Sequence, residues 1–349
     1  MPVGHITIRD INDALPRALP KLLLHGIPIT ASSAANARPT IEWPGVFITE
    51  YTNPMRNVLF DAKRDANPFF HYLEAMWILA GRNDVKTLGL ILPKMADYSD
   101  DGETFHGAYG HRLRHWPDLG DNEMDQLEAS IQILRNAPTS RQVVMGIWNP
   151  ALDLGAQTKD MPCNDLIMLK VRNGALNVTV CNRSNDAIWG CYGANAVQFS
   201  MLTMYIAARL GVKVGVYMQV SDSFHVYEDN LFWQSFKDEY AADPDSFEEQ
   251  HRATPYNRLG DSNLFEKGIE TFDAELKQFW QDAELHDLDL PLRADYQTPA
   301  VADAAFIHNA QQAIRAKDFK MARLYLDQMH ASDWQLGCQQ WMNRREGKS

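Results

Sequence analysis

The sequence predicts an α+β fold whose C-terminal part is mostly helical, and three observations support this. Three segments rich in apolar and β-branched residues follow one another between residues 142 and 221. The second of these segments carries Asn173-Gly174 between two apolar runs, which is the strongest short-range signal for a β-hairpin. Beyond residue 238 the chain first becomes acidic and loop-like and then acquires helical periodicity.

Shorter elements are expected before these strands. The first 40 residues mix short apolar runs with Pro, Ala, Ser and Asn, which indicates an edge segment or arm. Residues 41–60 have the composition of strands interrupted by a proline turn. Residues 69–81 have apolar side chains at helical spacing and end in glycine, so they predict a helix. A turn-rich loop is expected over 97–110 and a short amphipathic helix over 124–136.

The chain is expected to have three parts. They are an N-terminal arm (1–40), a catalytic core (41–237) and a mostly helical C-terminal extension (238–349). Within the core, residues 194–210 predict a buried helix between the second and third strands. Within the extension, residues 298–331 predict a pair of antiparallel helices.

Composition and charge limit the possible functions. The 349 residues include 33 Lys and Arg against 45 Asp and Glu, which gives a formal charge of −12. Because phosphate backbones are bound by basic faces, no nucleic-acid partner is expected. No apolar stretch approaches the roughly 18 residues of a membrane span, so no membrane partner is expected either. The N-terminus lacks the features of a signal peptide and the four cysteines are scattered, so we expect a cytoplasmic protein.

Two neighbouring features could carry chemistry. Cys163 precedes a predicted strand, and a thiol reacts as its thiolate, which nearby cations favour. Twenty residues later, Arg183 and Ser184 follow a β run, where a guanidinium could bind a phosphate. Taken alone, Cys163 could equally be a small buried side chain and Arg183 a surface charge. The histidines of residues 106–115 lack acidic or cysteine partners at ligand spacing, so no metal site is expected.

A longer set of motifs resembles the thymidylate synthases and the pyrimidine-nucleotide hydroxymethylases, most closely those of bacteriophages. The motifs are Glu74-x-x-Trp77, Tyr109-Gly110, Ser140-Arg141, Trp148-Asn149-Pro150, Pro162-Cys163, Arg183-Ser184-x-Asp186, Gly190, Asn195 and His225-x-Tyr227. They occur in the order and approximate spacing of that family over about half the chain. The resemblance implies a mixed β-sheet layer with packed helices, followed here by the helical extension.

The resemblance also implies covalent one-carbon transfer to a pyrimidine nucleoside monophosphate. In such enzymes a cysteine thiolate adds to C6 of the base, and C5 then takes a one-carbon unit from the cosubstrate 5,10-methylenetetrahydrofolate. The positions that match catalytic residues are Cys163 as nucleophile, Glu74, Tyr109 and Asp186. Those that match substrate-binding residues are Arg56, Arg141, Arg183, Ser184, Asn195, His225 and Tyr227, and Trp77 matches a cofactor-binding position.

The same resemblance implies individual roles. Arg183 and Ser184 match phosphate ligands, and Arg141 matches an arginine that the partner subunit donates, so a homodimer is implied. His225 and Tyr227 match the pair that holds the sugar 3′-hydroxyl. No metal is implied.

Two departures from the family pattern affect substrate recognition. Gln142 stands where a second arginine is usual, so Arg56 is a candidate for the missing phosphate contact. The segment between Gly190 and Asn195 is one residue longer than usual, so Ala194 is an alternative to Asn195 as the base-reading position. An asparagine can both donate and accept, which suits uracil; dUMP is therefore favoured, with dCMP or CMP as alternatives.

The last departure concerns the product. Residues 341–349 do not resemble the tail that closes over the folate in thymidylate synthases. A dry site lets the folate deliver hydride and gives a methyl group, whereas a positioned water gives a hydroxymethyl group. The sequence therefore favours a C5 hydroxymethyltransferase, located in the host cytoplasm if a phage encodes it. The alternatives are a thymidylate synthase, which makes dTMP with folate as reductant, and a non-catalytic nucleotide-binding regulator.

Overall fold

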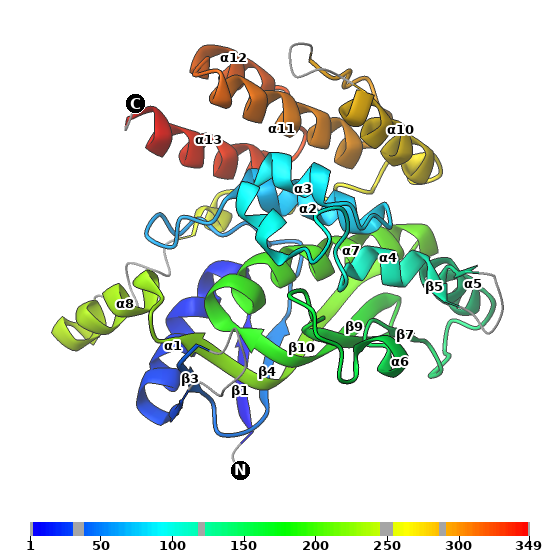
Figure 1. Cartoon of the computed structure of the whole chain (residues 1–349). Coiled ribbons are helices and arrows are strands. Elements are labelled where there is room, and N and C mark those ends of the chain that lie inside the picture. The colour runs from blue at the N-terminus through cyan, green and yellow to red at the C-terminus, as the bar shows by residue number, and fades with distance from the viewer. Residues whose placement is uncertain (1–2, 31–37, 118–122, 245–253, 286–290, 348–349) are drawn as a thin grey trace.

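A mixed β-sheet forms one layer of the structure, and helices are stacked on one of its faces (Figure 1). The sheet and helices confirm the predicted α+β class. The computed structural model describes residues 3–30, 38–117, 123–244, 254–285 and 291–347.

Within the described residues the main sheet has eight strands, six of them in the order β1-β4-β10-β9-β8-β7. These strands are β1 (Gly4–Ile8), β4 (Phe47–Tyr51), β10 (Lys213–Tyr227), β9 (Ala175–Asp186), β8 (Asn164–Arg172) and β7 (Val144–Gly146). The pairs β1–β4 and β9–β10 are parallel, and β4–β10, β8–β9 and β7–β8 are antiparallel. The short strands β2 (Ile27–Ile29) and β3 (Thr40–Glu42) pair with each other, and β3 also pairs with β10. A separate small sheet joins β5 (Trp116–Pro117) to β6 (Glu123–Met124).

The hairpin between β8 and β9 confirms the Asn-Gly prediction. Asn173 and Gly174 have φ values of 52° and 72°. Both lie in the left-handed region that a two-residue hairpin turn of type I′ requires. Side chains along β9 then alternate between buried and half-buried, as expected for a sheet that has helices on one face only.

The helices begin with η1 (Ile11–Asp13), α1 (Ala14–His25), α2 (Pro68–Leu79), α3 (Val85–Ile91), η2 (Pro93–Tyr98), α4 (Tyr109–Arg114), α5 (Gln126–Asn136) and α6 (Pro150–Asp153). They continue with the π-helical segment Ala187–Ala194, α7 (Asn195–Leu210), α8 (Leu231–Ala242), η4 (Pro255–Asn257), α10 (Phe272–Leu285), α11 (Pro299–Arg315), α12 (Phe319–Leu326) and α13 (Ser332–Glu346). The predicted helices near residues 69–81, 124–136 and 194–210 are thus confirmed, and α11 and α12 form the predicted helix pair. None of the described helices combines the length and apolarity that a membrane span needs.

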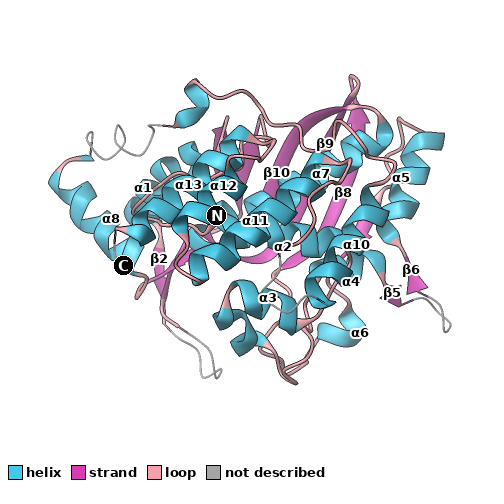
Figure 2. Ribbon diagram, turned by 90° about the horizontal axis from the view of Figure 1, so that it is seen from above, coloured by secondary structure: helices cyan, strands magenta, loops and turns pink. Residues whose placement is uncertain are grey.

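Helix α2 is the centre of the helical layers, and every one of its side chains is buried. It contacts α7 on one side and α11 and α13 on the other. The Tyr72 hydroxyl donates to the carbonyl of Ala300 at 2.9 Å, and Trp334 packs edge-to-face on the Tyr72 ring. Figure 2 looks down on the C-terminal helices, which lie over α2. Helices α11 and α13 therefore cover α2 on its outer side, while the three-part division of the chain stays a prediction.

Gly110, on α4, lies against the backbone of Ile78 on α2, so a substitution there tests how closely the two helices must pack. A Cβ at this position would lie 2.6 Å from Ile78 Cα and 2.7 Å from Ile78 C, and closer still to the carbonyl oxygen. Because these are backbone atoms, Gly110→Ala forces the two helices apart. We expect it to lower the free energy of unfolding by about 1–3 kcal/mol, measured by urea denaturation.

The matched control is Gly89→Ala, also in a helix, where the added Cβ meets nothing within 4 Å. Alanine is the better helix former, so this change is expected to stabilise the protein by about 0.5–1 kcal/mol. Equal effects of the two substitutions would contradict the close packing of α4 on α2.

Candidate active site

Cys163 and Arg183 lie together where β8 begins and β9 ends. The Arg183 amide donates to the Cys163 carbonyl at 3.0 Å. The Arg183 guanidinium donates to the carbonyls of Pro162 and Met161 at 2.8 and 3.1 Å, and its Nη2 lies 3.9 Å from Cys163 Sγ. One arginine thus fixes the segment before the strand and places positive charge beside the sulfur.

The thiol nevertheless has a raised pKa. Burial raises the pKa of the Cys163 thiol, and the charge of Arg183 opposes this effect without cancelling it. The expectation that arginine alone favours the thiolate is therefore incomplete, because desolvation is the larger effect here. A nucleophile in this state needs a nearby group to take its proton.

Glu74, on α2, is a buried carboxyl that can exchange protons near neutral pH. It is 7% exposed, and its Oε2 accepts a hydrogen bond from Gln198 Nε2 at 2.8 Å. Burial raises the Glu74 pKa to about 7, and the nearby charge of Asp160 contributes. A group with this pKa is suited to general acid–base catalysis.

The segment that leads into Tyr109 packs against the segment that contains Asp160. Tyr109 opens α4, and burial raises its pKa, with the charges of Cys163 and Asp160 adding to the effect. Asp160 is half-buried and accepts from the Gly107 amide at 2.7 Å. Sequence reasoning missed both Asp160 and Gln198. The position of Asp160 three residues before Cys163 was a signal that could have found it.

The register of β9 and β10 places further predicted residues side by side. Asp186 is opposite His225, and Ser184 is opposite Ser223. His225 Nδ1 lies 3.3 Å from Ser223 Oγ, and its ring packs edge-to-face on Tyr227 at 5.2 Å. The Asp186 carboxylate accepts from the Ile188 amide at 2.9 Å. Burial raises the Asp186 pKa, and the charges of His225 and Arg64 oppose it.

Asn195 joins a chain of buried amides. Its Nδ2 donates to Asn185 Oδ1 at 3.3 Å, and Asn185 donates in turn to Gln219 and Ser221, both at 2.9 Å. The preceding segment, 187–194, begins with wide helical turns and is interrupted by non-helical backbone at Tyr192 and Gly193. The longer segment noticed in the sequence therefore ends in a kink just before α7. Asn195 as the base-reading position, with Ala194 as the alternative, stays a prediction.

Three predicted residues have different surroundings. Arg56 pairs with Asp261 at 2.6 Å and packs on the Tyr256 ring, so its contacts lie in the part of the chain beyond residue 238. Arg141 is exposed, three positions before β7 begins. Trp77 is 3% exposed and donates to Asp84 at 3.2 Å.

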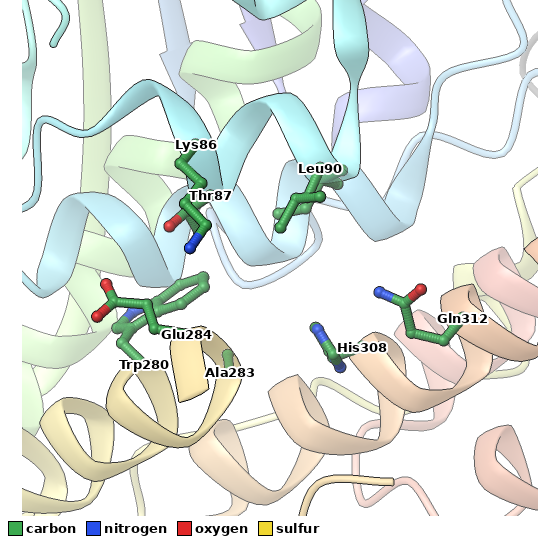
Figure 3. Close-up of a pocket in the computed structure, with 9 residues that line it drawn as sticks. Lys86, Thr87, Leu90, Trp280, Ala283, Glu284, His308 and Gln312 are labelled. Atoms are coloured by element: carbon green, nitrogen blue, oxygen red, sulfur yellow. The ribbon is translucent and has the colours of Figure 1, made fainter. Parts of the chain in front are cut away.

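A metal centre and a separate pocket are the other kinds of site to consider. Over the part of the chain that the structure describes, no three His, Cys, Asp or Glu side chains are grouped closely enough to hold a metal ion. A small pocket between α3, α10 and α11 contains none of the predicted site residues (Figure 3). Its lining residues are Lys86, Thr87, Leu90, Ile91, Trp280, Ala283, Glu284, His308 and Gln312.

A thiol beside a guanidinium, with a carboxyl three residues before it in the chain, is an arrangement that could support covalent catalysis by a cysteine. Comparison with known proteins narrows the class of protein to which the chain belongs. The thymidylate synthase family model matches residues 64–271. A deoxyuridylate hydroxymethyltransferase of Pseudomonas phage M6 is 37% identical over 97% of this chain and 94% of that protein. A deoxyuridylate hydroxymethyltransferase of Bacillus phage SP01 is 46% identical over 52% of this chain and 49% of that protein. A putative thymidylate synthase of Methanosarcina acetivorans is 30% identical over 64% of this chain and 89% of that protein.

The chain therefore belongs to the thymidylate synthase family, which confirms the resemblance seen in the sequence. It is a one-carbon transferase.

Glu74→Gln tests the buried carboxyl through stability. Because the Glu74 pKa rises from 4.5 to about 7 on folding, its neutral form is favoured in the folded protein. The stability that Glu74 contributes below pH 4.5 is therefore lost as the pH rises through 7. Glutamine keeps the acceptor for Gln198 and does not ionise. From pH 4 to pH 8 we expect the variant to gain about 3 kcal/mol in unfolding free energy relative to wild type.

Urea denaturation at a series of pH values measures this difference, and Glu266→Gln, at an exposed glutamate, is the control. If the difference in unfolding free energy between Glu74→Gln and wild type stays constant across this pH range, Glu74 does not titrate in the folded state as described.

Proposed function

We propose that this enzyme hydroxymethylates C5 of dUMP, with 5,10-methylenetetrahydrofolate as the one-carbon donor and a covalent bond between Cys163 and C6. The observation that carries the proposal is the similarity to a phage deoxyuridylate hydroxymethyltransferase over nearly the full length of both chains. The surroundings of Cys163 support it, because a thiol 3.9 Å from a guanidinium can form a thiolate once its proton is taken.

The side chains around Cys163 suit the successive steps of this reaction. Thiolate addition to C6 makes C5 nucleophilic, and transfer of the one-carbon unit comes next. Glu74, with a pKa of about 7, can give or take protons at the base during these steps. Asn195 can donate and accept hydrogen bonds, which suits the O4 and N3–H of uracil, while dCMP and CMP are the alternatives. His225 and Tyr227 hold the 3′-hydroxyl in this scheme.

Phosphate recognition is proposed to involve two copies of the chain. Arg183 and Ser184 act within one subunit, and the partner subunit's Arg141 completes the site. The exposed sheet face next to Arg141 supports a dimer. Val144 and Met168 pair directly across β7 and β8 and are 56% and 39% exposed. Burying such apolar side chains against a second copy would stabilise the assembly.

A thymidylate synthase reaction is the second candidate. The similarity to putative thymidylate synthases of archaea favours it. The two reactions differ in the fate of the folate, because methyl formation consumes its hydride and releases dihydrofolate.

Product analysis separates the two candidates. With dUMP and methylenetetrahydrofolate we expect the mass of 5-hydroxymethyl-dUMP and no rise in dihydrofolate absorbance at 340 nm. Cys163→Ala should abolish turnover, by a factor of at least about 10⁴, because no covalent adduct can form. Nucleotide binding should persist, since phosphate and sugar contacts come from other residues.

The control is Cys181→Ala, which removes a half-buried thiol on β9 and should retain activity. Stoichiometric dihydrofolate with a methylated product would establish the thymidylate synthase reaction instead. Normal turnover by the Cys163→Ala variant would show that Cys163 is not the nucleophile.

Mixed dimers test the role of Arg141. Arg141→Ala and Cys163→Ala should each be nearly inactive as homodimers. Co-refolding them in equal amounts gives heterodimers in which one site retains both residues. We expect about a quarter of wild-type activity to return, because half of the dimers are mixed and each has one intact site. Absence of recovery, with mixed dimers shown by mass spectrometry, would place Arg141 in its own subunit's site or outside the site.

A further inference from the structure

Asp160 is a second carboxyl close to the nucleophile, distinct from Glu74. It lies three residues before Cys163, in the segment whose carbonyls Arg183 holds. Its Oδ2 accepts from the Gly107 amide at 2.7 Å. A carboxylate has two oxygens and about four acceptor positions, so this bond leaves Oδ1 able to accept from a water.

The contact with Gly107 fixes where this carboxyl lies. A Cβ on Gly107 would be 2.6 Å from the Asp160 carbonyl oxygen and 3.2 Å from the Pro162 nitrogen. The segment 160–162 therefore packs directly against the chain that leads into Tyr109. The charge of Asp160 contributes to the raised pKa of three predicted site residues, Cys163, Glu74 and Tyr109.

We propose that Asp160 is a catalytic base that takes the proton of the water forming the hydroxymethyl group. This inference rests on the proposed function. Once the one-carbon unit is on C5 and the folate has left, the base carries an exocyclic methylene and remains bonded to Cys163 through C6. The water oxygen bonds to the methylene carbon while one water proton goes to Asp160.

The electrons balance in this step. The methylene double-bond pair moves to the C4 carbonyl and forms an enolate. The enolate then restores the C4 carbonyl and the C5–C6 double bond as the C6–S bond breaks and releases the Cys163 thiolate. The proton held by Asp160 matches the negative charge left on sulfur, so no oxidant or reductant is required.

The protonation states of the two carboxyls fit separate roles. Burial raises the Asp160 pKa to about 6; the Gly107 amide, His106 and Arg112 oppose the rise, and Asp100 adds to it. The Glu74 pKa is about 7. At pH 7 Asp160 is therefore mostly ionised and able to accept a proton, while Glu74 is half protonated. Two carboxyls with different pKa values in one site can act as base and acid.

Asp160→Asn removes the base and keeps an oxygen that can accept from Gly107. We expect hydroxymethyl formation to fall at least about 100-fold, within the usual range for loss of a general base. Covalent complex formation with 5-fluoro-dUMP and methylenetetrahydrofolate should be unchanged, because that complex forms before water enters. Added 2-mercaptoethanol should trap the methylene intermediate as a thioether in the variant. Asp160→Glu should recover part of the activity.

The pH profile gives an independent readout. The carboxylate is the active form, so the wild-type rate should fall as the pH drops below about 6, and Asp160→Asn should lose this limb. Glu103→Gln, which removes an exposed carboxylate from the preceding loop, is the control and should behave as wild type.

The outcomes are distinguishable. Wild-type rates of hydroxymethyl formation by Asp160→Asn would overturn the inference, and so would loss of the 5-fluoro-dUMP complex in that variant, which would show an earlier role. Neither result affects the proposed function. Formation of dTMP and dihydrofolate by the wild-type enzyme would overturn the proposed function, and the inference with it.

Discussion

The bonds from the Arg183 guanidinium to the carbonyls of Met161 and Pro162 hold the site in place. Carbonyls in an irregular segment must find donors when they are shielded from water, and here one side chain supplies both. The position of Cys163, and of Asp160 before it, depends on that arrangement. Because the same guanidinium lies 3.9 Å from the sulfur, the group that holds the segment before Cys163 also carries the charge that opposes the raised pKa of the thiol.

For Glu74, on α2, burial has a larger effect on the pKa than hydrogen bonding does. Helix α2 is covered on one side by α7 and on the other by the C-terminal helices, so Glu74 is removed from water without losing its hydrogen bond to Gln198. Desolvation is what moves a carboxyl towards a neutral pKa. The helices beyond residue 238 do not contain the predicted catalytic residues; they cover the other side of α2, where Tyr72 bonds to Ala300 and packs on Trp334.

Local signals in the sequence were sufficient for elements whose geometry is local. The Asn173-Gly174 turn, the helix around Glu74 and the pair α11–α12 were predicted because turn preferences and apolar periodicity act over a few residues. Contacts between side chains that meet only through tertiary packing could not be predicted from such local signals. Gln198 reaches Glu74 across 124 positions. Arg56 was a phosphate candidate by alignment, but the fold pairs it with Asp261, 205 positions away.

The hydrogen bond between Glu74 and Gln198 joins α2 to α7. Asn195 and Gln198 are three positions apart on α7, so their side chains share one face of that helix. The backbone at Tyr192 and Gly193, just before α7, is not helical, so α7 is not a rigid continuation of the turns that precede it. A shift or rotation of α7 would therefore move the proposed base-reading residue and the hydrogen-bond partner of Glu74 together.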